Sequence, residues 1–152
     1  MDMTGDYLIP APRQAVWDAL NDLAVLKEAI PGCEAIEWTS PTEIDAVVTA
    51  KIGPVKASFK GAITLSDLDP PKSYHIRGEG RGGAAGFAKG GAKVRLEEEA
   101  EGTRLIYTVD ASVGGKIAQV GGRLITAAAK KLADEFFARL GEIAAARAAG
   151  TA

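Results

Sequence analysis

The chain has 152 residues and a mass of 15.8 kDa, the size of one ordinary domain, so we expect a single domain over residues 1–152. Hydrophobic residues make up 47% and charged residues 25% of it, which excludes a disordered or fibrous protein. The 18 basic and 20 acidic side chains give a net charge of −2, without the basic excess of a generic nucleic-acid-binding protein.

Cys33 and His75 are the only residues of their kinds. The sequence therefore offers no intramolecular disulfide and no zinc or iron–sulfur site built from its own residues, and we expect no metal and no cofactor. It has no signal-peptide-like start and no run of 18 apolar residues, so we expect a cytoplasmic protein without a transmembrane helix.

The first thirty residues predict one strand and two short helices. Residues 3–9 predict a strand, which Pro10 and Pro12 end. A helix is predicted over 12–20, with Pro12 in its first turn, and a second over 22–29, with Asp22 as its N-cap. Pro31 and Gly32 then end the second helix.

The middle of the chain alternates apolar and polar residues with a period of two, which predicts strands with one buried and one solvent-facing side. Turn-forming pairs such as Gly53-Pro54 and Glu101-Gly102 separate them, as in antiparallel hairpins. The predicted strands cover 34–39, 42–50, 54–68, 72–80, 91–101 and 103–113.

The last part of the chain changes to a helical period and predicts one long helix from residue 116 to about 149. Its apolar stripe needs a long apolar partner, and the buried side of the sheet is the only candidate. We therefore predict an α+β fold in which a curved, antiparallel, seven-stranded sheet wraps around a long C-terminal helix, with a cavity between them. The stripe consists of Ile117, Val120, Leu124, Ala128, Leu132, Phe136, Leu140 and Ile143.

This order of elements resembles the helix-grip fold of the START, Bet v 1 and polyketide cyclase superfamily. Local motifs along nearly the whole chain narrow the resemblance to the G-subunit family of carbon monoxide dehydrogenase. These motifs are VWDALND (16–22), AIPGCE (29–34), IGPVKASFKG (52–61), GGKIAQVGGRLI (114–125) and LADEFFARL (132–140).

The resemblance implies a non-catalytic accessory protein without redox activity. Members of that family accompany molybdenum hydroxylases of the carbon monoxide dehydrogenase type. They are thought to recruit the enzyme to the inner face of the cell membrane and to hold a quinone or another prenyl lipid in an apolar cavity. Fuller members extend beyond the long helix, whereas this sequence ends close to the helix end.

From the buried sides of the strands and the helical stripe we predict which residues line the cavity. Tyr74 and Tyr107 are the candidates for hydrogen bonds to a ligand carbonyl. Phe87 joins them as an aromatic residue in a glycine-rich stretch. The full set is Val48, Phe59, Ile63, Tyr74, Phe87, Leu96, Tyr107, Val109, Ile117, Val120 and Leu124.

Seven glycines fall within residues 78–91. This stretch predicts either a mobile loop carrying Phe87 or an ordinary glycine-rich turn, and a dinucleotide-binding motif is disfavoured because a strand follows it. Gly121 and Gly122 lie inside the predicted long helix, where their cost in stability predicts close approach of a ligand or of the sheet. The basic residues of 116–152 indicate either contact with anionic lipid or a simple solvated surface.

The alternation places Glu43, Asp45, Glu97, Glu99 and Asp110 on the solvent side, which leaves no paired carboxylates inside. We therefore expect no catalytic residues. The expected function is to bind a quinone or prenyl lipid in support of a molybdenum hydroxylase. The alternatives are a ligand-free assembly factor for that enzyme and, less favoured, a cyclase or aromatase.

Overall fold

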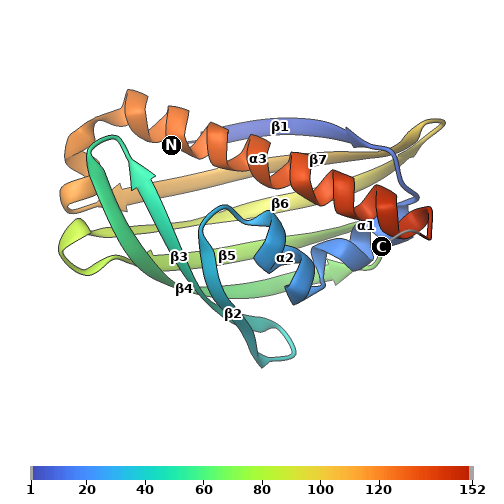
Figure 1. The fold of residues 1–152 in the computed structure, drawn as a ribbon, viewed down its shortest axis with the longest axis horizontal. Helices are drawn as coiled ribbons and strands as arrows, with labels where there is room; N and C mark the ends of the chain where they lie inside the picture. The colour runs from blue at the N-terminus through green and yellow to red at the C-terminus, as the bar shows by residue number, and fades with distance from the viewer. Residues whose placement is uncertain (1, 151–152) are drawn as a thin grey trace.

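The computed structural model describes residues 2–150 as one seven-stranded antiparallel sheet and a long helix, with two short helices after the first strand (Figure 1). The strand order is β1-β7-β6-β5-β4-β3-β2, so every strand except the first pairs with its neighbour in the chain. The strands are β1 (Asp2–Ile9), β2 (Cys33–Ser40), β3 (Glu43–Ile52), β4 (Val55–Asp69), β5 (Ser73–Arg81), β6 (Phe87–Glu99) and β7 (Gly102–Gly114). The helices are α1 (Arg13–Leu20), α2 (Leu23–Ala29) and α3 (Gly122–Ala148), with short 3₁₀ turns η1 (Gly83–Ala85) and η2 (Lys116–Val120).

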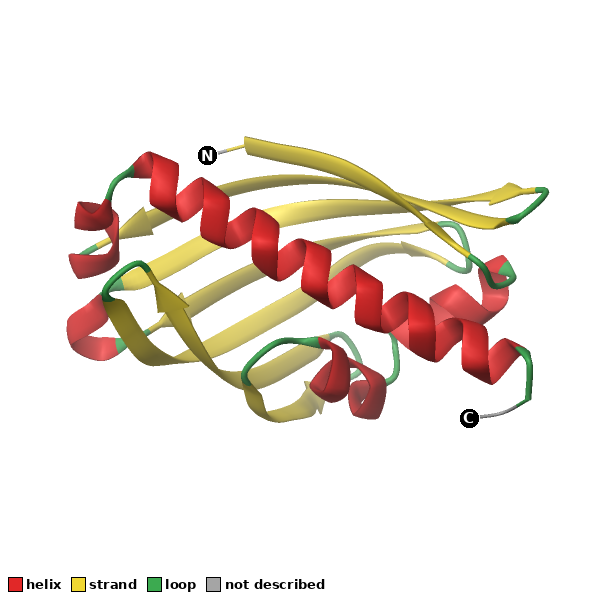
Figure 2. Cartoon of the chain, turned by 45° about the horizontal axis from the view of Figure 1, so that its top comes forward, coloured by secondary structure: helices red, strands yellow, loops and turns green. Residues whose placement is uncertain are grey.

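The predicted α+β architecture is confirmed, because α3 crosses the inner face of the curved sheet diagonally (Figure 2). The alternation assigned the faces correctly on β4, where Ile63 and Leu65 face the interior and Lys60 and Thr64 are exposed. Asp22 caps α2 as predicted, since its carboxylate accepts a hydrogen bond from the Ala24 backbone N–H.

Two predictions of local structure need correction. The glycine-rich stretch forms a hairpin turn, but this turn is shorter than predicted, because β5 continues to Arg81 and β6 begins at Phe87 and not at residue 91. The helix does not run unbroken from residue 116, because Gly121 has a φ of +97°, which a residue with a side chain rarely adopts. Open space surrounds Gly121 and Gly122, so backbone geometry at the start of α3, and not close approach of a ligand or the sheet, accounts for Gly121.

The core lies at the end of the sheet that α1 and the C-terminal half of α3 cover. Leu140 and Ala144 of α3 are completely buried there, together with Val16 of α1 and Leu105 of β7. About one turn before Leu140 on α3, the ring of Phe137 contacts Tyr7 of β1, with ring centres 4.7 Å apart. The helix is therefore fixed over the β1–β7 side of the sheet, and it leaves the β2–β5 side less closely covered.

One buried polar contact ties the connection after the first strand to the sheet. The Thr103 hydroxyl is completely buried and donates a hydrogen bond of 2.7 Å to the Ala11 carbonyl. We expect Thr103→Val to destabilise the protein by about 1–3 kcal/mol, because the Ala11 carbonyl loses this donor in a dry environment. Equilibrium urea unfolding measures this loss. Thr108→Val at an exposed position of the same strand is the control, and equal losses in the two variants would contradict the assignment.

Candidate functional site

An apolar pocket of about 280 Å³ opens on the β2–β5 side of α3, where α2 covers the sheet. Strands of the sheet provide its floor, α3 provides one wall, and the end of α1 with α2 provides the other. It is lined by Leu20, Asn21, Leu26, Ile30, Ile36, Trp38, Ile44, Ile63, Leu65, Tyr74, Ile76, Val94, Phe136 and Phe137.

Two features of the sequence form this pocket. Alternating apolar residues on the strands form its floor, and the break between the two short helices shapes one wall. Ile44, Ile63 and Gly78 lie opposite one another on β3, β4 and β5, so their inner faces form one row. Gly78 contributes no side chain to that row, and space is left beside Ile63. The wall turns at Asn21 and Asp22, which separate α1 from α2 and allow Leu26 and Ile30 to face the floor.

The lining holds no charged side chain, which limits the ligands that it can accept. Moving an isolated charge into such a site costs much more than apolar burial returns, so a fatty-acid carboxylate is a poor ligand there. A neutral hydrophobic molecule gains roughly 25 cal/mol for every Å² of apolar surface that it buries. The pocket is therefore suited to a neutral ligand.

Tyr74 supplies a polar group that borders the pocket. The residue is 4% exposed, and burial raises the pKa of its phenol well above the ordinary value, so the hydroxyl stays protonated. It makes no hydrogen bond within residues 2–150, yet no fully enclosed side-chain oxygen or nitrogen of those residues lacks a partner. The Tyr74 side chain lines the pocket, and its hydroxyl has no partner among the described residues. It is a hydrogen-bond donor available to a bound molecule.

A second hollow, of about 300 Å³, borders this row farther along the inner face. Its floor consists of small residues, because Gly78 pairs with Gly90 and Gly90 pairs with Ala111 across β5, β6 and β7. Gly78 leaves the space beside it unfilled, whereas Gly90 is required by the close approach of the Asp110 carbonyl of β7. Gly82, Gly83 and Gly86 belong to the turn between β5 and β6.

An aromatic cluster holds α3 at its distance from the sheet. Phe137 stacks on Tyr107 of β7 with ring centres 5.2 Å apart, and Phe136 meets Phe137 edge-on at 4.9 Å. The Tyr7 hydroxyl donates a hydrogen bond to the Asp134 carboxylate of α3. Burial, and then that hydrogen bond, raises the pKa of Tyr7 above its usual range, so the contact persists at neutral pH. Phe136 extends from this cluster into the pocket wall.

The predicted ligand-binding residues are spread over several parts of the molecule. Ile63 and Tyr74 line the pocket, and Val109 lines the small-residue hollow. Leu96, Tyr107 and Ile117 are buried, whereas Val48 and Phe59 are half-buried on β3 and β4. Val120, Leu124 and Phe87 lie at the far end of the molecule, around η2 and the β5–β6 turn, and none of the three lines the pocket.

Sequence reasoning missed the wall of the pocket. Leu26 and Ile30 were not among the predicted lining residues, and Phe136 was assigned only to the apolar stripe of the long helix. Trp38 carried a usable signal, because it alternates with Ile36 on the predicted strand 34–39, and both residues line the pocket. What the pattern did not contain is the position of α2 over β2.

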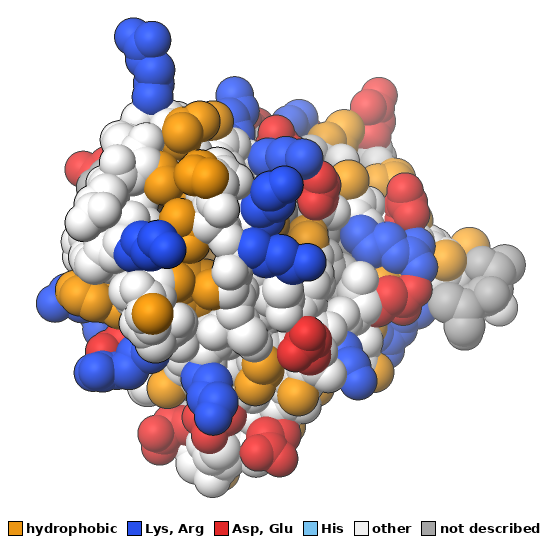
Figure 3. Space-filling view, turned by 60° about the vertical axis from the view of Figure 1, so that its left-hand side comes forward, with side chains coloured by type: hydrophobic (Ala, Val, Ile, Leu, Met, Phe, Trp, Pro, Cys, Tyr) orange, Lys and Arg blue, Asp and Glu red, His pale blue; other side chains and the backbone are white. Residues whose placement is uncertain are grey.

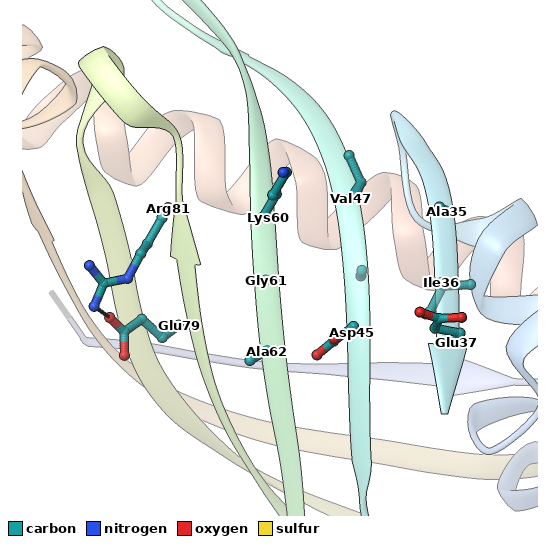
Figure 4. A pocket seen from close by; sticks show the side chains of 11 residues that line it. Ala35, Ile36, Glu37, Asp45, Val47, Lys60, Gly61, Ala62, Glu79 and Arg81 are labelled. Carbon is teal, nitrogen blue, oxygen red and sulfur yellow. Dashed lines mark hydrogen bonds and ion pairs between the residues drawn. The ribbon is translucent and has the colours of Figure 1, made fainter. Parts of the chain in front are cut away.

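A larger hollow, of about 530 Å³, lies on the opposite, outer face of β2–β5 (Figure 4). Its charged side chains are exposed on the strands, and two of them, Glu79 and Arg81, form an ion pair at 2.8 Å. It is a shallow trough over small residues such as Ala62, without an enclosed polar group. We therefore assign the site to the smaller pocket on the inner face, whose lining is the more apolar of the two.

Groups with catalytic potential lie outside the pocket. His75 is paired with Asp67 at 2.8 Å on the outer face, and burial raises the pKa of the half-buried Cys33 thiol. The five carboxylates predicted to face solvent are all exposed. Among residues 2–150, no three His, Cys, Asp or Glu side chains are grouped to hold a metal ion. Within that range no helix is both long and apolar enough to cross a membrane.

Comparison with known proteins gives one family match. The model of the CoxG family, described as the G subunit of carbon monoxide dehydrogenase, matches residues 5–145. A solved structure of a conserved protein from Geobacillus kaustophilus is 30% identical and has a TM-score of 0.90, with 95% of each chain covered. No curated protein matches the sequence.

More distant structures share the fold. A protein from Thermus thermophilus is 19% identical with a TM-score of 0.72, covering 97% of this chain and 99% of its own. The Zhui aromatase/cyclase from a Streptomyces species is 15% identical with a TM-score of 0.71, covering 97% and 94%. At these identities the similarity demonstrates the helix-grip fold alone.

Proposed function

The chain belongs to the CoxG family of carbon monoxide dehydrogenase, and on that premise we propose that it is a non-catalytic carrier of a neutral hydrophobic ligand, a quinone or another prenyl lipid. In this proposal it serves a molybdenum hydroxylase of the carbon monoxide dehydrogenase type in the cytoplasm, at the inner face of the cell membrane.

The observation that supports this proposal most directly is the unpaired Tyr74 hydroxyl at the edge of an uncharged pocket. A quinone carbonyl is a neutral acceptor attached to an apolar body, so it can take the Tyr74 hydrogen bond while its remainder is buried beside Phe136 and Ile63. The same lining offers no acid or base to a substrate, which favours carriage over a cyclase reaction.

A ligand analysis tests the proposal. The protein is expressed in a quinone-producing host, purified without detergent, extracted with organic solvent and analysed by mass spectrometry. We expect a quinone or prenyl lipid in stoichiometric amount. An empty extract, together with no binding of added quinone, would contradict carriage and favour the ligand-free assembly factor.

Tyr74→Phe tests the role of the hydroxyl separately. We expect quinone affinity to fall by about three- to tenfold, which corresponds to one hydrogen bond, in a titration followed by fluorescence quenching. Folding stability should barely change, because the hydroxyl has no partner to lose within the described chain. A saturated isoprenoid alkane is the control ligand, and its affinity should be equal for the unmodified protein and for Tyr74→Phe. Equal quinone affinities would rule out the hydrogen bond.

A further inference from the structure

Basic and acidic residues are strongly segregated along this nearly neutral chain. Residues 46–66, 80–96 and 111–133 contain none of the 20 acidic residues. They provide the β3–β4 turn, the β5–β6 turn, η2 and the beginning of α3, which meet at one end of the molecule (Figure 1). Viewed onto this end, the surface displays many Lys and Arg side chains around an apolar area (Figure 3).

Four of these basic residues, Lys51, Lys56, Lys116 and Arg123, are exposed at the extreme end. Lys51 and Lys56 lie directly opposite each other in the β3–β4 register, an arrangement that is repulsive between like charges. None of the four forms an ion pair within residues 2–150. The positive charge here is therefore not neutralised by the chain itself.

The opposite end of the molecule differs in this respect. Arg104 bonds to Glu99 and Asp6, Arg139 to Glu28 and Glu142, and further arginines there are paired as well. Because those charges are compensated internally, an anionic partner would be attracted to one end of the molecule only.

Two large apolar side chains project from the same positive end. Phe87 is 39% and Leu124 is 47% exposed. The Phe87 ring lies against Gly114, and Leu124 packs near Gly53 of the β3–β4 turn, so η2 lies between them. We call this surface the basic tip: Lys51, Lys56, Lys116 and Arg123 with Phe87 and Leu124.

We propose that the basic tip docks onto the surface of an anionic lipid bilayer, with Phe87 and Leu124 entering the headgroup region and the four cationic side chains contacting phosphate groups. Three of the four cations are lysines, whose compact charges on flexible stems suit a fluid array of phosphates. An acidic protein surface would instead favour the bidentate carboxylate geometry of arginine. Exposed Phe and Leu side chains among lysines are suited to the membrane interface, where hydrated headgroups adjoin the apolar acyl chains.

Docking by the tip orients the whole molecule. The helix α3 begins at the tip and extends about 40 Å from it, because its 27 residues rise 1.5 Å each. Its C-terminal end, with the paired arginines, therefore points away from the bilayer. This inference deepens the membrane location proposed above, and it does not depend on what the pocket binds.

Vesicle co-sedimentation tests the docking surface. We expect the full chain to bind vesicles of phosphatidylcholine and phosphatidylglycerol at low salt, to bind pure phosphatidylcholine vesicles much more weakly, and to lose binding at high salt. Neutralising Lys51 and Lys56 together as K51Q/K56Q should lower the partition coefficient more than tenfold, since each basic residue contributes a factor of about five.

Matched controls separate the tip from general charge and apolarity. K27Q/K72Q removes the same charge elsewhere and should change binding less than twofold. Phe87→Ser with Leu124→Ser should reduce binding, whereas Leu8→Ser with Leu68→Ser, at similarly exposed positions, should not. No binding to anionic vesicles, or equal losses in tip and control variants, would overturn the proposal. If the basic tip bound a soluble acidic protein but not anionic vesicles, its partner would be a protein and not a membrane.

The pocket and the tip are distinguished by one further variant. Ile63→Trp alters the pocket alone and should bind vesicles as the unmodified protein does. Vesicle binding without any extracted lipid would leave the docking surface intact and contradict only the carrier function. Extracted quinone without vesicle binding would support the carrier function and contradict the docking surface.

Discussion

Replacing Ile63 with tryptophan should reduce the affinity for a neutral hydrophobic ligand by at least about tenfold while the fold is retained. Ile63 is half-buried on β4 and lines the pocket, and its neighbour in register is Gly78. An indole at this position can extend over Gly78 into space that no side chain occupies, so it competes with the ligand more than with the core. A steric cost of about 1.4 kcal/mol in the complex already corresponds to a tenfold loss.

The measurement is a quinone titration of purified, lipid-stripped protein, with circular dichroism to verify the fold. Val120→Trp is the matched control, because Val120 belongs to η2 at the far end of the molecule and is outside the pocket lining. If Val120→Trp abolished binding and Ile63→Trp did not, the ligand site would lie at the η2 end and the pocket assignment would be wrong.

Replacing Leu140 with alanine should lower the free energy of unfolding by about 3 kcal/mol. Leu140 is completely buried on α3, in the cluster that joins the helix to Ile9, Val16 and Leu105. The substitution removes apolar contacts and leaves a cavity, because neighbouring strands cannot collapse into the space. A domain of this size is stable by roughly 5–15 kcal/mol, so this change is a large fraction of the total.

Leu124→Ala is the control for that experiment, since it makes the same substitution in the same helix at a position that is 47% exposed. The two changes alter helix propensity alike, and we expect the exposed one to cost less than about 0.5 kcal/mol. Urea unfolding of both variants compares them. Similar losses would mean that the C-terminal half of α3 is not the part fixed to the core.

Period-two alternation predicted the sheet because each strand has one buried side. This signal identifies the facing direction of Ile63, Leu65, Tyr74 and Leu96 without any knowledge of the strand order. It also placed the exposed carboxylates correctly. It failed at Gly90, because glycine has no side chain whose polarity could show a face, and the start of β6 was therefore interpreted as part of a loop.

The pocket could be predicted only in part, since its floor and wall are encoded differently. Floor residues such as Ile63 and Tyr74 follow from alternation. The wall depends on where α2 rests and on which side of the sheet α3 crosses, and these positions follow from contacts between distant segments, such as Phe137 against Tyr7 and Tyr107. The helical stripe identified Leu124 as buried, but the helix start at Gly122 lies at the edge of the sheet and leaves it exposed.

The pairing of β1 with β7 imposes an order on folding. The first strand has no partner among its neighbours in the chain, and the hydrogen bond from Thr103 to Ala11 spans 92 residues. During synthesis, β1 leaves the ribosome before the other strands and must therefore wait, unpaired, until the last strand, β7, has emerged. Such distant pairings slow folding, and an unpaired strand is open to association with other chains in the meantime. Alternating charged residues such as Asp2 and Asp6 on its exposed side keep that waiting strand soluble.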